Sequence, residues 1–187
     1  MNKNDSSINK RLSFLWDFIL RMSLTGKQVA QIFGFTEQAL YRVKRMDDIH
    51  LSKLISFFAA LGFSFEIKMK NNPYSKEEMP VRQGCWYRYA ERGQLPFLCD
   101  SLGTNGITME MLSAALNLSP TAIRHSFKTN DIPFSRICKI ASLFGMSVVI
   151  EIRPIPSKSK QPILPGSRLI SSITFTELYK NQSLNEE

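Results

Sequence analysis

The segment TGKQVAQIFGFTEQALYRVKR, residues 25–45, predicts two short helices joined by a tight turn. Thr25 and Gln28 have the spacing of a capping box, which satisfies free amides at the start of a helix. Gly34 ends this helix, because glycine accepts the positive φ of a tight helix exit. Thr36 is placed to cap a second helix that runs to the end of the quoted segment. The pattern therefore indicates a pair of helices that cross over a short turn.

The segment recurs 83 positions later as TMEMLSAALNLSPTAIRHSFK, residues 108–128, and the alignment extends over both flanks without a gap. Residues identical in the two copies include Asp48 with Asp131 and Gly62 with Gly145. The chain is an internal duplication, so we expect two folded units related by a two-fold or near two-fold axis.

Each copy also predicts a helix before the quoted segment, a helix after it, and then a strand. Apolar residues at helical spacing indicate helices over residues 11–22 and 51–61. We expect Asp48 to cap the later helix and Asp131 to cap its counterpart. The apolar period then changes from about 3.6 to about 2, as in a strand with one buried face. The alternating apolar residues are Phe63, Phe65, Ile67 and Met69 in the first copy and Met146, Val148, Ile150 and Ile152 in the second.

These elements predict a mainly α fold with minor β. Each unit has four helices followed by one strand, and a lone strand would expose unpaired backbone groups at its edge. We therefore expect the two strands to pair antiparallel, which makes the chain a pseudo-dimer, meaning one chain whose two units take the place of two subunits. The expected divisions are unit 1 (residues 8–70), a linker with an aromatic segment (71–94), unit 2 (95–153) and a proline-containing tail (154–187), of which residues 175–179 can dock back.

The composition of the 187 residues excludes several function classes. Hydrophobic residues make up 43% of the chain, as in ordinary globular proteins, and no apolar run is long enough to cross a bilayer. The start of the chain lacks a signal-peptide pattern, so we expect a cytoplasmic protein. Because there is no phosphate-binding glycine loop, nucleophile motif or set of paired metal ligands, we expect no enzyme, cofactor or metal. The net charge of +8 favours a polyanionic partner or an anionic surface.

Two groups of residues allow either a structural or a functional interpretation. The three cysteines form an odd set without ligand spacing, and we expect Cys99 and Cys138 to fill the core. The aromatic and basic cluster of residues 86–92 could stack on unpaired bases. A linker helix that lays these aromatic side chains on the core is the favoured interpretation.

The two quoted segments resemble the helix-turn-helix of the phage-repressor family, which includes Cro, lambda repressor and the XRE regulators. In that pattern a small residue stands where the helices cross, and here this place holds Ala30 and Ser113. The turn glycine is Gly34 in unit 1, whereas unit 2 has Asn117, which tolerates the same left-handed backbone. The apolar places of unit 1 are Val29, Phe33, Phe35, Leu40 and Val43. Unit 2 departs from the pattern at Ser126, where an apolar residue is usual. The resemblance implies a lambda-repressor-like four-helix fold for each unit.

The resemblance also implies which residues contact double-stranded DNA. The second helix of each pair would enter the major groove, where Gln38 can read adenine and Arg42 guanine, at about 1–3 kcal/mol of discrimination each. The residues placed near base edges are Thr36, Glu37, Gln38, Tyr41, Arg42 and Arg45 in unit 1 and Ser119, Thr121, Arg124, His125 and Lys128 in unit 2. Lys27, Gln28 and Lys44 are better placed for phosphates.

These features favour a sequence-specific DNA-binding protein, a transcriptional regulator of bacterial or phage type that acts as a repressor. As a monomeric pseudo-dimer, the chain would present two recognition helices about 34 Å apart, and further dimerisation stays open. The competing interpretation of each basic face is a solvated surface. The competing function is a protein-interaction scaffold, or an antitoxin-like partner, in which the fold is structural and the tail or the linker aromatics bind another protein.

Overall fold

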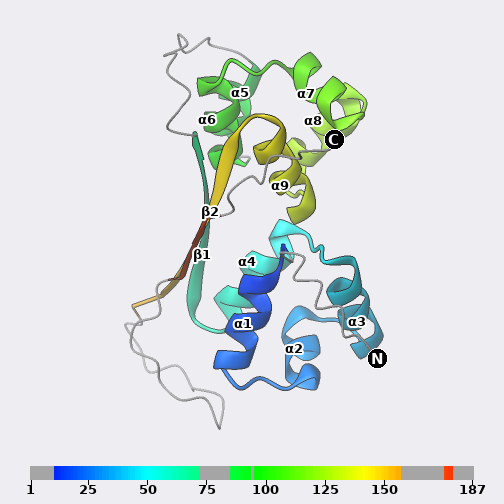
Figure 1. Ribbon diagram of the computed structural model, residues 1–187, viewed down its shortest axis with the longest axis vertical. Helices are drawn as coiled ribbons and strands as arrows, with labels where there is room; N and C mark the ends of the chain where they lie inside the picture. Colours follow the sequence, from blue (N-terminus) through cyan, green and yellow to red (C-terminus); the bar gives the residue numbers. More distant parts are fainter. Residues whose placement is uncertain (1–10, 72–84, 94, 157–174, 179–187) are drawn as a thin grey trace, which may run out of the picture.

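The computed structural model describes residues 11–71, 85–93, 95–156 and 175–178, which form a mainly helical chain with a small sheet (Figure 1). Unit 1 contains α1 (Ser13–Arg21), α2 (Gly26–Phe33), α3 (Glu37–Met46), α4 (Leu51–Ala60) and β1 (Phe63–Asn71). The linker contributes α5 (Cys85–Glu91). Unit 2 contains α6 (Pro96–Thr104), α7 (Met109–Leu116), α8 (Pro120–Lys128), α9 (Phe134–Leu143) and β2 (Met146–Pro154), and the tail adds β3 (Phe175–Leu178). The predicted class, mainly α with minor β, is confirmed. Residues 8–10, 72–84, 94, 157–174 and 179–187 of the predicted divisions lie outside the described residues.

β1 and β2 pair antiparallel along their whole length, as the duplication predicts. At the centre of this ladder Ile67 lies opposite Ile150, and these two residues are counterparts in the repeat. A local two-fold axis therefore passes between the strands. The apolar face of the ladder is covered by α4 on β1 and by α9 on β2. The polar face carries charges, with Lys68 Nζ 2.9 Å from Glu151 Oε2.

The sheet has a third strand beyond the two that the pairing argument predicts. β3 pairs antiparallel with β2, and the order of the strands is β1-β2-β3. The ladder runs from Val149 opposite Leu178 to Ile152 opposite Phe175. The expectation that a short element near residues 175–179 docks back is confirmed for residues 175–178. This strand satisfies backbone groups on one edge of β2, which an open edge would leave unpaired.

The N-termini of α4 and α9 meet on a local two-fold axis. His50 lies opposite Pro133 in an isolated antiparallel bridge, and these residues are again counterparts in the repeat. On either side of this bridge, the first amide of each helix donates to a carbonyl of the other unit. These hydrogen bonds are Leu51 N to Ile132 O (3.0 Å) and Phe134 N to Ile49 O (2.8 Å). Each helix therefore begins on the backbone of the opposite unit.

The prediction that Asp48 caps α4 and Asp131 caps α9 is wrong, because each carboxylate caps the helix of the other unit. Asp48 accepts hydrogen bonds from the amide and the hydroxyl of Ser135, at 2.8 and 2.6 Å. In the reverse direction, Asp131 accepts from the amide of Ser52 at 3.0 Å, and its second oxygen lies 2.9 Å from His50 Nδ1. The two-fold contact places each aspartate at the opposing helix start, where free amides need acceptors.

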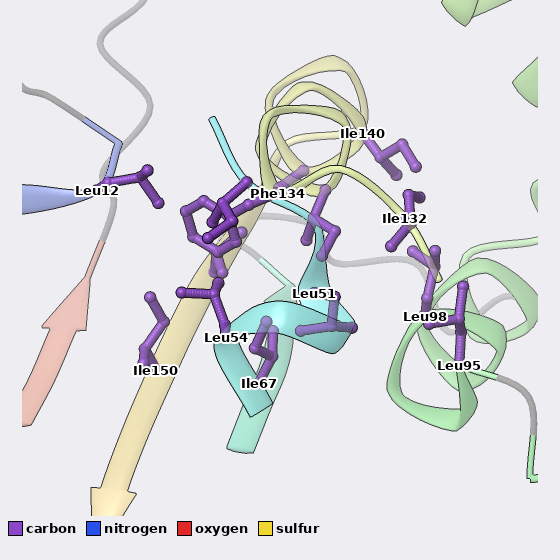
Figure 2. Packing of buried hydrophobic residues seen from close by; sticks show 14 of the residues in the cluster. Leu12, Leu51, Leu54, Ile67, Leu95, Leu98, Ile132, Phe134, Ile140 and Ile150 are labelled. Atoms are coloured by element: carbon purple, nitrogen blue, oxygen red, sulfur yellow. The ribbon is translucent and has the colours of Figure 1, made fainter. Parts of the chain in front are cut away.

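One hydrophobic core runs through both units. Phe14 of α1 meets Phe134 of α9 edge to face, with ring centroids 5.5 Å apart. Figure 2 shows side chains of both units gathered at this contact, among them Leu51 and Leu54 of α4 and Ile150 of β2. A shared core is expected for units of this size, because each would bury little apolar surface alone.

The linker helix α5 packs against α6 of unit 2. Trp86 is 3% exposed, and its Nε1 donates to the carbonyl of Ile107 at 2.5 Å. The rings of Trp86 and Tyr89 both pack on Phe127 of α8, with centroids 4.9 and 5.2 Å away. The interpretation that linker aromatics cover the core is confirmed for these two residues, whereas Tyr87 is exposed.

Two cysteines are predicted to fill the core. Cys99 is buried and Cys138 is half-buried, in agreement with their predicted place in the core. Burial raises the pKa of the Cys138 thiol to about 12, so this thiol stays protonated at neutral pH.

None of the helices in the described ranges combines the length and the apolarity needed to cross a bilayer.

Replacing Asp48 or Asp131 with alanine should lower the free energy of unfolding by about 1–2 kcal/mol, because each change removes the cap from a helix of the opposite unit. Urea unfolding followed by circular dichroism measures this loss. Asp17→Ala is the matched control, since Asp17 is exposed on α1 and its replacement should change stability by less than about 0.5 kcal/mol. A loss at Asp48 no larger than that of the control would contradict the exchanged caps.

Candidate nucleic-acid interface

In unit 1, α2 and α3 pack together across a short turn. Thr25 and Gln28 each accept a hydrogen bond from the other's backbone amide, which confirms the predicted capping box. Gly34 adopts the left-handed conformation, with φ of 67°, as predicted. Ala30 is 3% exposed, and its carbonyl accepts from the amide of Phe35 at 2.8 Å. The small side chain thus lets the chain turn back closely over α2.

In unit 2, α7 and α8 form the same turn with different residues. Asn117 takes the left-handed conformation, with φ of 53°. Ser113 is buried at the crossing, where its hydroxyl donates to the carbonyl of Leu118 and its carbonyl accepts from the Leu118 amide. Ser119 caps α8 through a hydrogen bond from a backbone amide, and Pro120 follows it in the first turn. The turn chemistry predicted for this segment is confirmed.

The structure places α3 with one side against the core and the other side in solvent. No residue of α3 is buried. Its inner side consists of the partly buried residues Ala39, Leu40 and Val43. Its outer side is exposed and carries Glu37, Gln38, Tyr41, Arg42, Lys44 and Arg45, which we call the unit 1 face. The inward and outward sides agree with those predicted from the sequence.

Arg42 and Arg45 place two positive charges on the unit 1 face. Within the part of the chain that the structure describes, neither guanidinium forms an ion pair. Tyr41 directly precedes Arg42 in the chain and is 69% exposed, although burying an aromatic ring is ordinarily favourable. Glu37 is the one acidic residue of this face and lies at the start of the helix. These side chains are available to contact another molecule.

Three of the predicted contact residues of unit 1 also serve the fold. Thr36 is the N-cap of α3, with its hydroxyl accepting a backbone hydrogen bond at 3.1 Å. The side-chain oxygen of Gln28 is engaged in the capping box of α2. Lys44 leans toward α1, with Nζ 5.7 Å from the centroid of the Trp16 ring. Lys27, by contrast, is exposed in the first turn of α2.

α8 is embedded more deeply than α3, because Ile123, Ser126 and Phe127 are buried. Ser126 stands where the helix pattern favours an apolar residue. Its hydroxyl lies 3.1 Å from a guanidinium nitrogen of Arg136, which donates to it from α9. A buried hydroxyl with a partner costs little, which explains how unit 2 tolerates this departure. The exposed polar residues are Ser119, Thr121, Arg124, His125 and Lys128, which we call the unit 2 face.

Glu110 changes the charge beside the unit 2 face. It lies in the first turn of α7, and its counterpart in the repeat is Lys27. The pKa of the Glu110 carboxyl is lowered by a hydrogen bond from its own backbone amide, then by one from Thr108, and by the charge of Arg124, against the effect of desolvation. The carboxylate is therefore ionised at neutral pH and attracts Arg124. Sequence reasoning missed this residue, although aligning the two copies reveals the exchange of lysine for glutamate.

The two helix pairs consequently differ in charge. Residues 26–46 hold four basic and one acidic side chains, whereas the equivalent residues 109–129 hold two basic and one acidic side chains together with His125. The unit 1 face has the stronger attraction for an anion.

The two faces lie in different halves of the molecule and on the same side of it. Figure 1 shows the strands along one side and α3 and α8 toward the opposite side, with α4 and α9 between the halves. The structure thus gathers the residues predicted to lie near base edges on α3 and its N-cap in unit 1 and on α8 and its N-cap in unit 2. The predicted phosphate contacts Lys27 and Gln28 lie apart from them, in the first turn of α2. The contact between α4 and α9 lies between the unit 1 residues and the unit 2 residues (Figure 1).

Comparison of the chain with protein-family models, with curated proteins and with solved structures finds no match. Among the described residues, no three histidine, cysteine, aspartate or glutamate side chains are grouped so that they could hold a metal ion. The arrangement of α3 and α8 offers surface charge and hydrogen-bonding groups.

Replacing Arg42 and Arg45 together with glutamine should change the free energy of unfolding by less than about 0.5 kcal/mol, because both side chains are exposed and unpaired in the described structure. Leu40→Ala, on the inner side of the same helix, should cost about 1 kcal/mol or more. Thermal and urea unfolding measure both. A large loss in the double variant would show that the unit 1 face supports the fold instead of being free to bind.

Proposed function

We propose that the chain binds double-stranded DNA in a sequence-specific manner and regulates transcription as a repressor of bacterial or phage type. In this proposal each unit is a lambda-repressor-like helix-turn-helix module. The observation that carries it is the pair of exposed polar faces on α3 and α8, each helix set on a tight turn and held on one side of a two-fold contact. The net charge of +8 supports an anionic partner.

The unit 1 face supplies the chemistry of base reading. α3 enters the major groove, where the Arg42 guanidinium suits the two acceptors of guanine and the Gln38 amide suits adenine. Lys27 and the amides at the start of α2 contact the flanking phosphates, which set the register of the helix on the duplex. Bound across a promoter, the chain blocks access of other proteins to that stretch of DNA.

A salt titration tests this function directly. Affinity for a 40-base-pair duplex selected from random sequence is measured by fluorescence anisotropy between 50 and 200 mM salt. A protein that neutralises about five phosphates gives a slope of log affinity against log salt of about −4.5. A flat response, or no binding to any selected duplex, contradicts the proposal and favours the protein-interaction scaffold or antitoxin-like partner.

Arg42→Gln combined with Arg45→Gln should weaken binding to the selected duplex by at least about tenfold, because each lost guanidinium contact is worth about 1–3 kcal/mol. The matched control is Lys70→Gln combined with Arg88→Gln, which removes the same charge from exposed residues of β1 and α5. At 150 mM salt the control should bind within about twofold of the parent, since screening acts over about 8 Å. Equal losses of affinity in the two variants would contradict base reading by the unit 1 face, because net charge alone would then explain the effect.

A further inference from the structure

The contacts between the units are reciprocal about the local two-fold axis. Ile67 pairs with Ile150 and His50 pairs with Pro133, and in each pair the two residues are counterparts in the repeat. The aspartate caps of α4 and α9 cross in both directions. Because one core also spans both units, α3 and α8 are held in a fixed arrangement on the same side of the molecule (Figure 1).

The reading residues on this symmetric frame are not symmetric. The counterpart of Gln38 is Thr121, and the counterpart of Arg42 is His125. A threonine hydroxyl cannot make the two hydrogen bonds that a glutamine amide makes with adenine. A histidine ring cannot make the bidentate hydrogen bond that an arginine guanidinium makes with guanine. The two halves of a bound site must therefore differ in base sequence.

The phosphate contacts differ as well. Lys27 is exposed in the first turn of α2, where a phosphate is favoured by charge and by free amides. Its counterpart Glu110 carries a negative charge at the same place in α7 and attracts the positive charge of Arg124 on the unit 2 face. A phosphate approaching unit 2 meets repulsion where unit 1 offers attraction.

We propose that one chain occupies one directional DNA site, built from two inverted and unlike half-sites about one helical turn apart, in which unit 1 supplies most of the affinity and Glu110 limits the contribution of unit 2. This inference rests on the proposed function and specifies its ligand. The chain takes one orientation on the duplex, because exchanging the two units would bring each face to the wrong half-site.

The first test uses the full chain and a duplex selected from random sequence. Native mass spectrometry should find one chain per duplex. Inserting five base pairs between the half-sites turns one of them to the opposite side of the helix and should lower affinity to that of a single half-site. Scrambling the half-site of unit 1, identified by footprinting the Arg42→Gln variant, should cost more affinity than scrambling the other.

The outcomes separate this inference from the proposed function. Failure to bind any duplex overturns both. Specific binding by two chains per site, or binding that is indifferent to the insertion, overturns the inference and leaves DNA binding in place. Equal losses on scrambling either half-site overturn the claim that unit 1 dominates.

The second test changes Glu110. Glu110→Lys should tighten binding and make the salt slope steeper by about 1, since it adds one phosphate contact. Glu110→Gln should tighten binding without steepening the slope, because it removes repulsion and adds no cation. Glu91→Lys, an equal charge change at an exposed position of α5, is the control and should leave the slope unchanged. A Glu110→Lys slope equal to that of the parent would show that unit 2 does not reach the phosphates.

Discussion

The exchange of helix caps at the two-fold contact is the interaction on which the rest of the structure depends. α4 and α9 each begin with free amides, and each finds its acceptors in the opposite unit, from a backbone carbonyl and an aspartate. The strands that follow these helices then lie side by side and pair through their counterpart isoleucines. The position of α3 and α8 follows from this frame, because both helix pairs pack on helices anchored at the same contact.

Local structure was largely predictable from the sequence, because it is set by short-range chemistry. The capping box at Thr25, the left-handed turns at Gly34 and Asn117, and the change of period before each strand all depend on residues close together in the chain. Even the pairing of the strands could be predicted, since duplication supplies two lone strands that need partners. The prediction that Asp48 caps a helix of its own unit failed because the cap is a long-range contact. An aspartate that caps a distant helix has the same sequence pattern as one that caps the helix next to it.

The candidate site shows the same division between local and long-range information. Exposure of the unit 1 face follows from the helical period, and the structure agrees with it. Two contacts depend on packing between helices: Lys44 lies over the Trp16 ring, and Arg136 donates a hydrogen bond to Ser126. The spacing of residues in the sequence does not indicate either contact. The two units have diverged most in such places: the counterpart of Lys44 is Phe127, a buried ring under α5. In unit 1 this position carries a positive charge, whereas in unit 2 its aromatic ring packs against the linker helix.

The crossed caps also bear on how the chain is made. A ribosome releases unit 1 first, yet the acceptors for the start of α4 reside at Asp131 and Ile132, and the partner of β1 is β2. Unit 1 therefore emerges with its last helix uncapped and its strand unpaired, and it completes its structure only after some eighty further residues have been synthesised, by the spacing of the two copies. Domains usually fold in order as they leave the ribosome. Here the duplication ties the completion of the first unit to the arrival of the second.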